Sequence, residues 1–197
     1  MPIPVREYDR TLNSEVERLQ YQVTVVLQEA EGLVQGLSTR QFNWSPAPKS
    51  WSILQCLDHL NTVDQLWLNG LKAAVQRGKS DGALHPGPYS YGWLGRFFLR
   101  LIQPDSKRKF KAPAAYQPQA NPDPQAVLSK WNQIHAETGK LLGEANGVDL
   151  SGIKVAMPGL KWIKLNLGIG FWVMTAHDRR HLQQMREVRN HPGFPKQ

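Results

Sequence analysis

The chain has little cysteine and no long apolar stretch, and both absences restrict the kind of protein it can be. Cys56 is the only cysteine among 197 residues, so no disulfide can form within the chain, which fits a reducing compartment. No stretch approaches the ~18 uninterrupted apolar residues of a membrane-spanning helix. Residues 1–7 lack the apolar core of a signal peptide. The sequence therefore predicts a cytoplasmic protein without a membrane span.

Alternation of apolar and polar residues, the pattern of a half-buried strand, is almost absent, whereas helical spacing is common. Apolar residues recur every three or four positions in four stretches, with Ser50 and Pro124 as helix-start residues for the second and third. These stretches predict helices over about residues 8–37, 50–77, 124–145 and 165–189. At this length, with 41% hydrophobic residues, the chain can bury one core. We therefore expect residues 1–197 to form a single all-α domain, a four-helix bundle.

Between the second and third predicted helices, residues 78–123 form a long insertion rich in glycine, proline and aromatic residues. An excursion of this length usually forms a lid, a cap or a dimer surface. It contains one short amphipathic stretch, 91–102, with three large aromatic residues: Trp93, Phe97 and Phe98. These rings either close over a site or, as we prefer, make core or dimer contacts. Residues 146–164 are expected to be a linker with a short extended piece at 153–157.

The sequence His177-Asp178-Arg179-Arg180-His181 places two histidines four residues apart in the last predicted helix. This step turns about 400° and rises about 6 Å along a helix. Both imidazoles therefore lie on one face, spaced to hold one divalent metal. A zincin helix has the same spacing but places Glu directly after the first His as general base. Here Asp178 has that position and points about 100° away, so the sequence disfavours a metalloprotease.

A metal site on this helix needs a third ligand, and four other histidines are available. His85 and His191 each precede a proline in a loop and are expected to be exposed. His135 lies in the middle of the third predicted helix and stays a candidate. His59 lies on the inward apolar stripe of the second helix, where an unpaired imidazole would lose its hydration. A core histidine bonded to a carbonyl is the alternative, but beside a His-x3-His helix in a bundle we favour His59 as a ligand.

Three motifs carry a resemblance to a known family. They occur in this order: Trp51-Ser52-Ile53-Leu54-Gln55-Cys56-Leu57-Asp58-His59-Leu60, then Lys109-Phe110-Lys111-Ala112-Pro113 with Tyr116-Gln117-Pro118, then His177-Asp178-Arg179-Arg180-His181-Leu182-Gln183-Gln184. The chain resembles the DinB/YfiT-like superfamily of metal-dependent proteins, in its DinB_2 branch, over nearly its whole length. The resemblance implies a four-helix bundle, one divalent metal on His59, His177 and His181, and frequent homodimers. It also implies a relationship to thiol-dependent transferases and isomerases.

A metal held by three neutral imidazoles keeps its full charge and an open coordination position, which is typical of catalytic rather than structural zinc. Such an ion lowers the pKa of bound water towards about 7 and deprotonates a bound thiol. We therefore predict a metal-dependent transferase or hydrolase acting on a small-molecule substrate. Metal-bound water or a thiolate is the expected reactive group, and a low-molecular-weight thiol the expected partner. Imidazole ligands suit Zn, Ni or Fe, so the identity of the metal stays open.

Side chains on the same helix faces are candidates for orienting the ligands or the substrate. Gln184 shares the face of the histidine pair, and Gln55 lies one turn before His59, so either can orient an imidazole or a bound water. Arg180 can hold an anionic substrate through its guanidinium. Ordinary solvated polar residues are the alternative for all three. Cys56 is close enough in sequence to approach the metal, although a buried structural thiol is the favoured interpretation.

The formal charge of +8 raises the question of an anionic partner. Cations cluster in the basic loop at 107–111 and along the last helix, as Arg179, Arg180, Arg186 and Arg189. A solvated basic surface is the favoured interpretation. Two other functions stay open: a non-catalytic metal-binding or stress-linked interaction module, and a basic nucleic-acid-binding bundle. The last is the least favoured, because the sequence has no helix-turn-helix or zinc-finger spacing.

Overall fold

The computed structural model describes residues 12–103 and 112–196. Within these ranges the chain forms six α-helices, one 3-10 turn and two strands. They are α1 (Ser14–Val34), α2 (Thr39–Asn43), α3 (Ile53–Ser80), α4 (Trp93–Ile102), η1 (Ala114–Tyr116), α5 (Pro124–Glu144), β1 (Lys154–Met157), β2 (Leu160–Asn166) and α6 (Leu167–Arg189). The predicted helical bundle is confirmed. No helix in the described part is both long enough and apolar enough to cross a bilayer.

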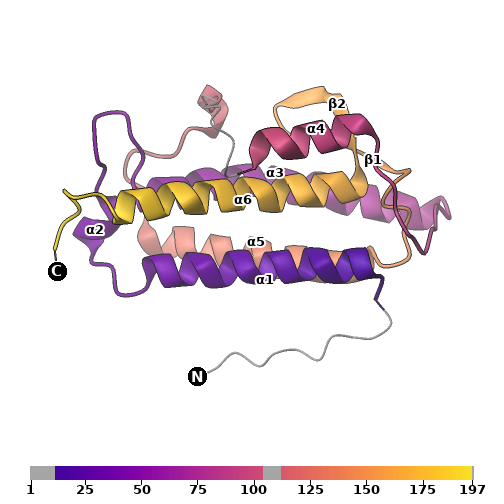
Figure 1. Ribbon diagram of the computed structural model, residues 1–197, viewed down its shortest axis with the longest axis horizontal. Coiled ribbons are helices and arrows are strands. Elements are labelled where there is room, and N and C mark those ends of the chain that lie inside the picture. Colours follow the sequence, from indigo (N-terminus) through magenta and orange to yellow (C-terminus); the bar gives the residue numbers. More distant parts are fainter. Residues whose placement is uncertain (1–11, 104–111, 197) are drawn as a thin grey trace.

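The four long helices form the bundle, with α1 and α6 running in one direction and α3 and α5 in the other (Figure 1). Both α1 and α3 pack against α5 and α6, so α5 and α6 lie across a diagonal of the bundle. Because α3 and α5 are parallel neighbours, the chain between them has to return along the bundle. The 28 residues of α3 correspond to about 42 Å at ~1.5 Å per residue. This return explains the long insertion, which lays α4 along α6 and η1 against α3.

Buried apolar side chains form two clusters, one toward each end of the bundle. The first includes Leu19, Trp67 and Leu71, and the second includes Leu57 and Leu182. Between the two clusters lie buried polar side chains from three helices: Asp64 of α3, His135 of α5 and Asp178 of α6. We call these three residues the polar layer. The apolar core is therefore interrupted by charge-bearing groups near the middle of the bundle.

Local caps set the helix starts. The Ser52 side chain accepts a hydrogen bond from the Gln55 backbone N–H, and the Gln55 side chain accepts one from the Ser52 N–H, forming a capping box at the start of α3. This corrects the predicted cap at Ser50 and moves the helix from 50–77 to 53–80. The first helix begins after its cap Asn13 rather than at residue 8, and residues 8–11 lie outside the described part.

The antiparallel hairpin of β1 and β2 is the main departure from the prediction of a linker over 146–164. β1 corresponds to the predicted extended piece, while β2 also takes the first two residues of the predicted last helix. Only Leu165 of β2 is fully buried, paired with Val155 of β1. The alternation that signals a strand is therefore weak in the sequence, which explains why the hairpin was not predicted.

Candidate metal centre

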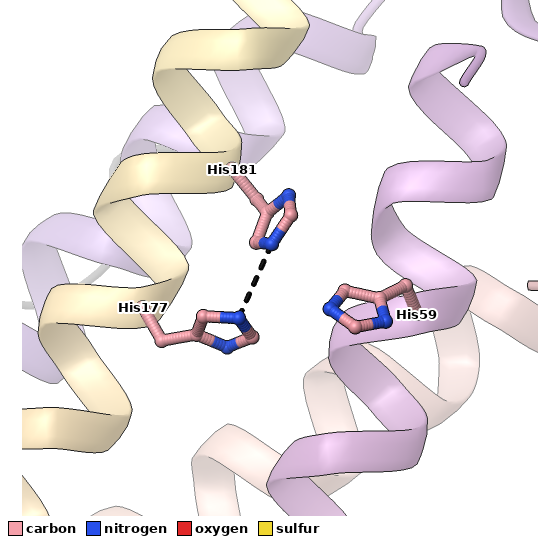
Figure 2. A group of neighbouring side chains, drawn as sticks. All are labelled: His59, His177 and His181. Carbon is pink, nitrogen blue, oxygen red and sulfur yellow. Dashed lines mark hydrogen bonds between the residues drawn. The ribbon is translucent and has the colours of Figure 1, made fainter. Parts of the chain in front are cut away.

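The fold brings His59, His177 and His181 together between two antiparallel helices. His59 projects from α3 toward His177 and His181, which lie one turn apart on the facing side of α6 (Figure 2). One ligand nitrogen from each residue can be chosen so that all three lie within 4.8 Å of one another. His59 is buried, with 4% of its surface exposed, and the other two are half-buried. Helical spacing predicted the His177–His181 pair, and the packing of α3 against α6 adds His59.

Hydrogen bonds direct the same ring nitrogen, Nε2, of His59 and His181 into the cluster. The Nδ1 of His59 lies 2.6 Å from the Tyr116 carbonyl oxygen, which can only accept, so Nδ1 carries the proton. The Nδ1 of His181 lies 3.0 Å from Oε1 of Gln184 and donates to it. Each Nε2 is then left with a free lone pair, the form that binds a metal.

The distance between His177 Nε2 and His181 Nε2 is 3.2 Å. Two nitrogens bound to one ion at roughly 2.0–2.1 Å lie about 2.8–3.4 Å apart at octahedral to tetrahedral angles. The pair therefore has the separation that a shared ion requires. His177 Nδ1 is buried and has no hydrogen-bond partner among the described residues, so the polar contact of this ring is the one between its Nε2 and His181 Nε2.

Burial lowers the pKa of all three imidazoles. For His181, burial and the neighbouring His59 ring lower the pKa to about 3. For His177, burial is again the main cause, and His181, His59 and Arg180 add repulsion that keeps its pKa well below the ordinary value. Burial also lowers the pKa of His59, against the opposing effects of the Tyr116 carbonyl and the Asp58 carboxylate. At neutral pH the cluster is a set of uncharged donors.

Trp51 and the end of η1 contact the histidine cluster, and the sequence analysis predicted neither contact. The Trp51 ring stacks on His181 at 5.8 Å and 22°, and its centroid lies 4.7 Å from that of His59. The backbone N–H of Gln119 donates to the Asp58 carboxylate at 2.8 Å, which holds the segment after η1 beside His59. The family motif includes Trp51 without assigning it a role. A carbonyl contact from a distant segment leaves no signal in the sequence.

The three predicted supporting residues, Gln55, Arg180 and Gln184, make different contacts, and only Gln184 has a hydrogen bond to one of the clustered histidines in the described part. Gln184 contacts His181, as described above. Gln55 instead caps α3 and reaches only the carbonyls of Gln119 and Ala120, at 3.4 Å, so it has no hydrogen bond to a histidine in the described part. The Arg180 guanidinium is close enough to lower the pKa of His177 and donates to the Leu101 carbonyl at 3.3 Å.

The remaining histidines and the cysteine lie elsewhere. His85 accepts from the Gly87 N–H in an exposed loop, and His191 packs on Trp44, so neither joins the cluster. His135 belongs to the polar layer. Cys56 is fully buried in the second apolar cluster, and burial raises the pKa of its thiol. The structural interpretation of this cysteine is therefore supported.

The aromatic residues of α4 do not cover the histidines. Trp93 and Phe97 are exposed, at 74% and 47% of their surface, while Phe98 packs on the apolar core. A groove of about 720 Å³ borders Asp58 and Tyr116, but none of the three clustered histidines lines it.

The arginines of α6 mostly bind α1. Arg179 donates to the Gln22 side chain at 3.1 Å, Arg186 pairs with Glu29 at 2.8 Å, and Arg189 donates to the Leu33 carbonyl at 2.9 Å. These contacts account for much of the basic surface as packing between helices. The basic loop at 107–111 lies outside the described residues.

Comparison with curated proteins and comparison with solved structures each found no match. The family model of the DinB superfamily, DinB_2, matches residues 22–185, which include α3, α5, most of α6 and the three histidines. The chain therefore belongs to the DinB superfamily.

Proposed function

We propose that this chain is a metal-dependent enzyme in which His59, His177 and His181 hold one divalent ion beside a small-molecule substrate. The observation that carries the proposal is the convergence of three uncharged imidazoles from two helices, with ligand atoms within 4.8 Å of one another. Among the described residues no carboxylate or thiol belongs to this group. Three protein ligands leave a coordination position for a substrate, as in catalytic zinc sites.

The donor set fits a borderline divalent ion such as Zn, Ni or Fe, since imidazole nitrogen suits all three. Such an ion supplies Lewis acidity and lowers the pKa of a water or thiol that binds it. Because the three ligands are uncharged, the site favours an anion in the remaining position. A low-molecular-weight thiol or a carboxylate-bearing substrate has this chemistry, and transfer or hydrolysis is the reaction class that it supports.

The protein itself contributes orientation and exclusion of water. Hydrogen bonds to the Tyr116 carbonyl and the Gln184 side chain hold the rings of His59 and His181 in the metal-binding tautomer. The indole of Trp51 covers both rings. Arg180 places positive charge close to His177, which favours an anionic group of the substrate.

The proposal also includes a homodimer, in which α4 of one chain contacts a second copy of the chain. Trp93 and Phe97 of α4 are large apolar side chains left exposed on the chain, and burying them against a second copy would remove apolar surface from water. Sedimentation equilibrium of wild-type protein and of a Trp93→Ser, Phe97→Ser variant tests this contact. A monomeric wild type would contradict it.

The metal site is tested by elemental mass spectrometry on tag-free protein after reconstitution with zinc. His59→Ala should lose one equivalent of metal per chain relative to wild type, because it removes one of three ligands. His85→Ala is the matched control, a histidine in an exposed loop, and should lose none. Equal metal content in all three proteins would refute the ligand set.

The proposed enzymatic activity is tested by a second assay, which measures turnover. Wild type and His59→Ala are compared for consumption of low-molecular-weight thiols by electrophilic substrates, and for hydrolysis of activated esters and amides. Turnover that disappears with the metal supports the enzyme. Metal loss in His59→Ala without any metal-dependent turnover would favour a non-catalytic metal-binding module.

A further inference from the structure

The polar layer lies between the two apolar clusters, and its residues come from three different helices. Asp64, His135 and Asp178 have 0%, 1% and 0% of their surface exposed. α5 and α6 face each other across the diagonal of the bundle, so the layer lies on the bundle axis. Burying three titratable groups at the centre of a core is costly unless they are paired or bind an ion.

Hydrogen bonds within the described residues account for only part of this layer. His135 Nδ1 lies 3.0 Å from the Trp131 carbonyl oxygen and donates to it, and its Nε2 lies 3.3 Å from Oδ2 of Asp178. Both carboxyl oxygens of Asp64 and the second oxygen of Asp178 are buried and have no N–H or hydroxyl donor among the described residues. Burial and the neighbouring Asp178 carboxyl, which can share a proton with Asp64, raise the pKa of Asp64 well above its ordinary value. Apart from that shared proton, these three buried oxygens lack the contacts that such groups almost always make.

The same atoms have the arrangement of a ligand set. One atom from each side chain lies within 4.8 Å of the other two. The bond from His135 Nδ1 to a carbonyl leaves Nε2 to bind a metal, which is how ligating histidines are normally held. Its 3.3 Å separation from Asp178 Oδ2 lies within the range of about 2.8–3.4 Å for two ligands of one ion. A divalent ion would also neutralise two carboxylates next to a neutral imidazole.

We propose that Asp64, His135 and Asp178 form a second divalent-cation site, inside the bundle core and separate from the histidine cluster. The two sites use different faces of α6, since Asp178 and His177 are adjacent in sequence and diverge by about 100° around the helix. Only the core site includes α5. Two carboxylates and one imidazole suit Zn, Mn or Fe. The second site does not depend on the enzymatic proposal.

Metal stoichiometry in a set of five proteins, one of them a control, separates the two sites. Each protein is reconstituted with zinc, desalted and analysed by elemental mass spectrometry. We expect about two equivalents of zinc per chain in wild type and about one in each of the single variants, His181→Ala and Asp64→Asn. The double variant, which combines both substitutions, should bind close to none. Asp58→Asn in the His181→Ala background is the matched control, because it removes a different carboxylate of α3, and it should retain about one equivalent.

The outcomes distinguish the proposals. If His181→Ala removes all the metal and Asp64→Asn removes none, the core site does not exist. In the layer, Asp64 and Asp178 then share a proton, and His135 bonds to Asp178. If Asp64→Asn lowers the metal content and His181→Ala does not, the core site stands and the histidine site fails.

A thermal shift tests the core site without altering its residues. His181→Ala protein, first treated with chelator and desalted, is melted with and without Mn²⁺ at about 100 times its dissociation constant. Binding to the folded state alone should raise Tm by about 5–10 °C. No change in Tm with either Mn²⁺ or Zn²⁺, at concentrations up to millimolar, would overturn the proposal.

Discussion

Acidification should destabilise the metal-free protein through its buried histidines, and a substitution of His181 should remove the part that this residue contributes. Burial and the neighbouring His59 ring lower the pKa of His181 from its ordinary value of 6.5 to about 3. The unfolded chain therefore binds a proton at a higher pH than the folded chain does. For a group lowered in this way, stability is fully present above pH 6.5 and is lost as the pH falls toward 3.

The size of the effect follows from the difference between the two pKa values. Each pH unit between them costs about 1.4 kcal/mol, so at pH 4.5 the unfolded state gains roughly 2–3 kcal/mol from this residue. His181→Asn removes the titrating ring, while its side-chain amide can still donate to Gln184. The loss of unfolding free energy between pH 7 and pH 4.5 should be smaller in the variant than in wild type by that amount.

Urea unfolding with excess chelator, followed by circular dichroism at both pH values, measures this difference. The chelator is needed because bound metal would add its own pH dependence. His85→Asn, in the exposed loop, is the control and should follow wild type. Parallel losses of stability in wild type and His181→Asn would refute the assignment of His181 as a buried neutral histidine.

Four further outcomes are expected. Gly78→Ala should destabilise the protein by about 1–3 kcal/mol in urea unfolding, because the new Cβ would lie 2.4 Å from Ile153 and 2.7 Å from Val148 side-chain carbons. Gly32→Ala, with no atom within 4 Å, should instead stabilise α1 by about 0.5–1 kcal/mol. A destabilised Gly32→Ala with an unchanged Gly78→Ala would contradict the packing described. Ser52→Ala should cost about 1 kcal/mol through loss of the α3 cap, and no change in the urea midpoint would argue against it. Chelator should lower the Tm of metal-loaded wild type, and an unaltered melt would count against metal bound to the folded state.

The parts of the fold that could be predicted from the sequence are those that depend on short-range periodicity. The apolar spacing of α3 and α5 depends on residues three and four apart, so it is visible in any stretch of helix length. The shared face of His177 and His181 follows from the same geometry. The predicted cap at Ser50 was wrong, because the side chains of Ser52 and Gln55 form the capping box of α3 two residues further along.

The remaining features of the candidate sites depend on contacts between residues that are far apart in the sequence. His59 became a ligand candidate through its place on an apolar stripe and a family resemblance, but its meeting with α6 depends on how the helices pack. The sequence alone left His135 open as a third ligand. The structure assigns it to the core with Asp64 and Asp178, because α5 lies diagonally across from α6.

The sequence by itself thus determined the helical bundle, the histidine pair on one helix face and the family. Tertiary structure decided what surrounds these features: the Trp51 stack, the carbonyl of Tyr116 on His59, the hairpin, and the polar layer on the bundle axis. The physical reason is the range of the interactions. Helix formation and facing are set by neighbours within two turns, whereas carbonyl contacts, ring stacking and the pairing of buried charges depend on residues brought together only by packing.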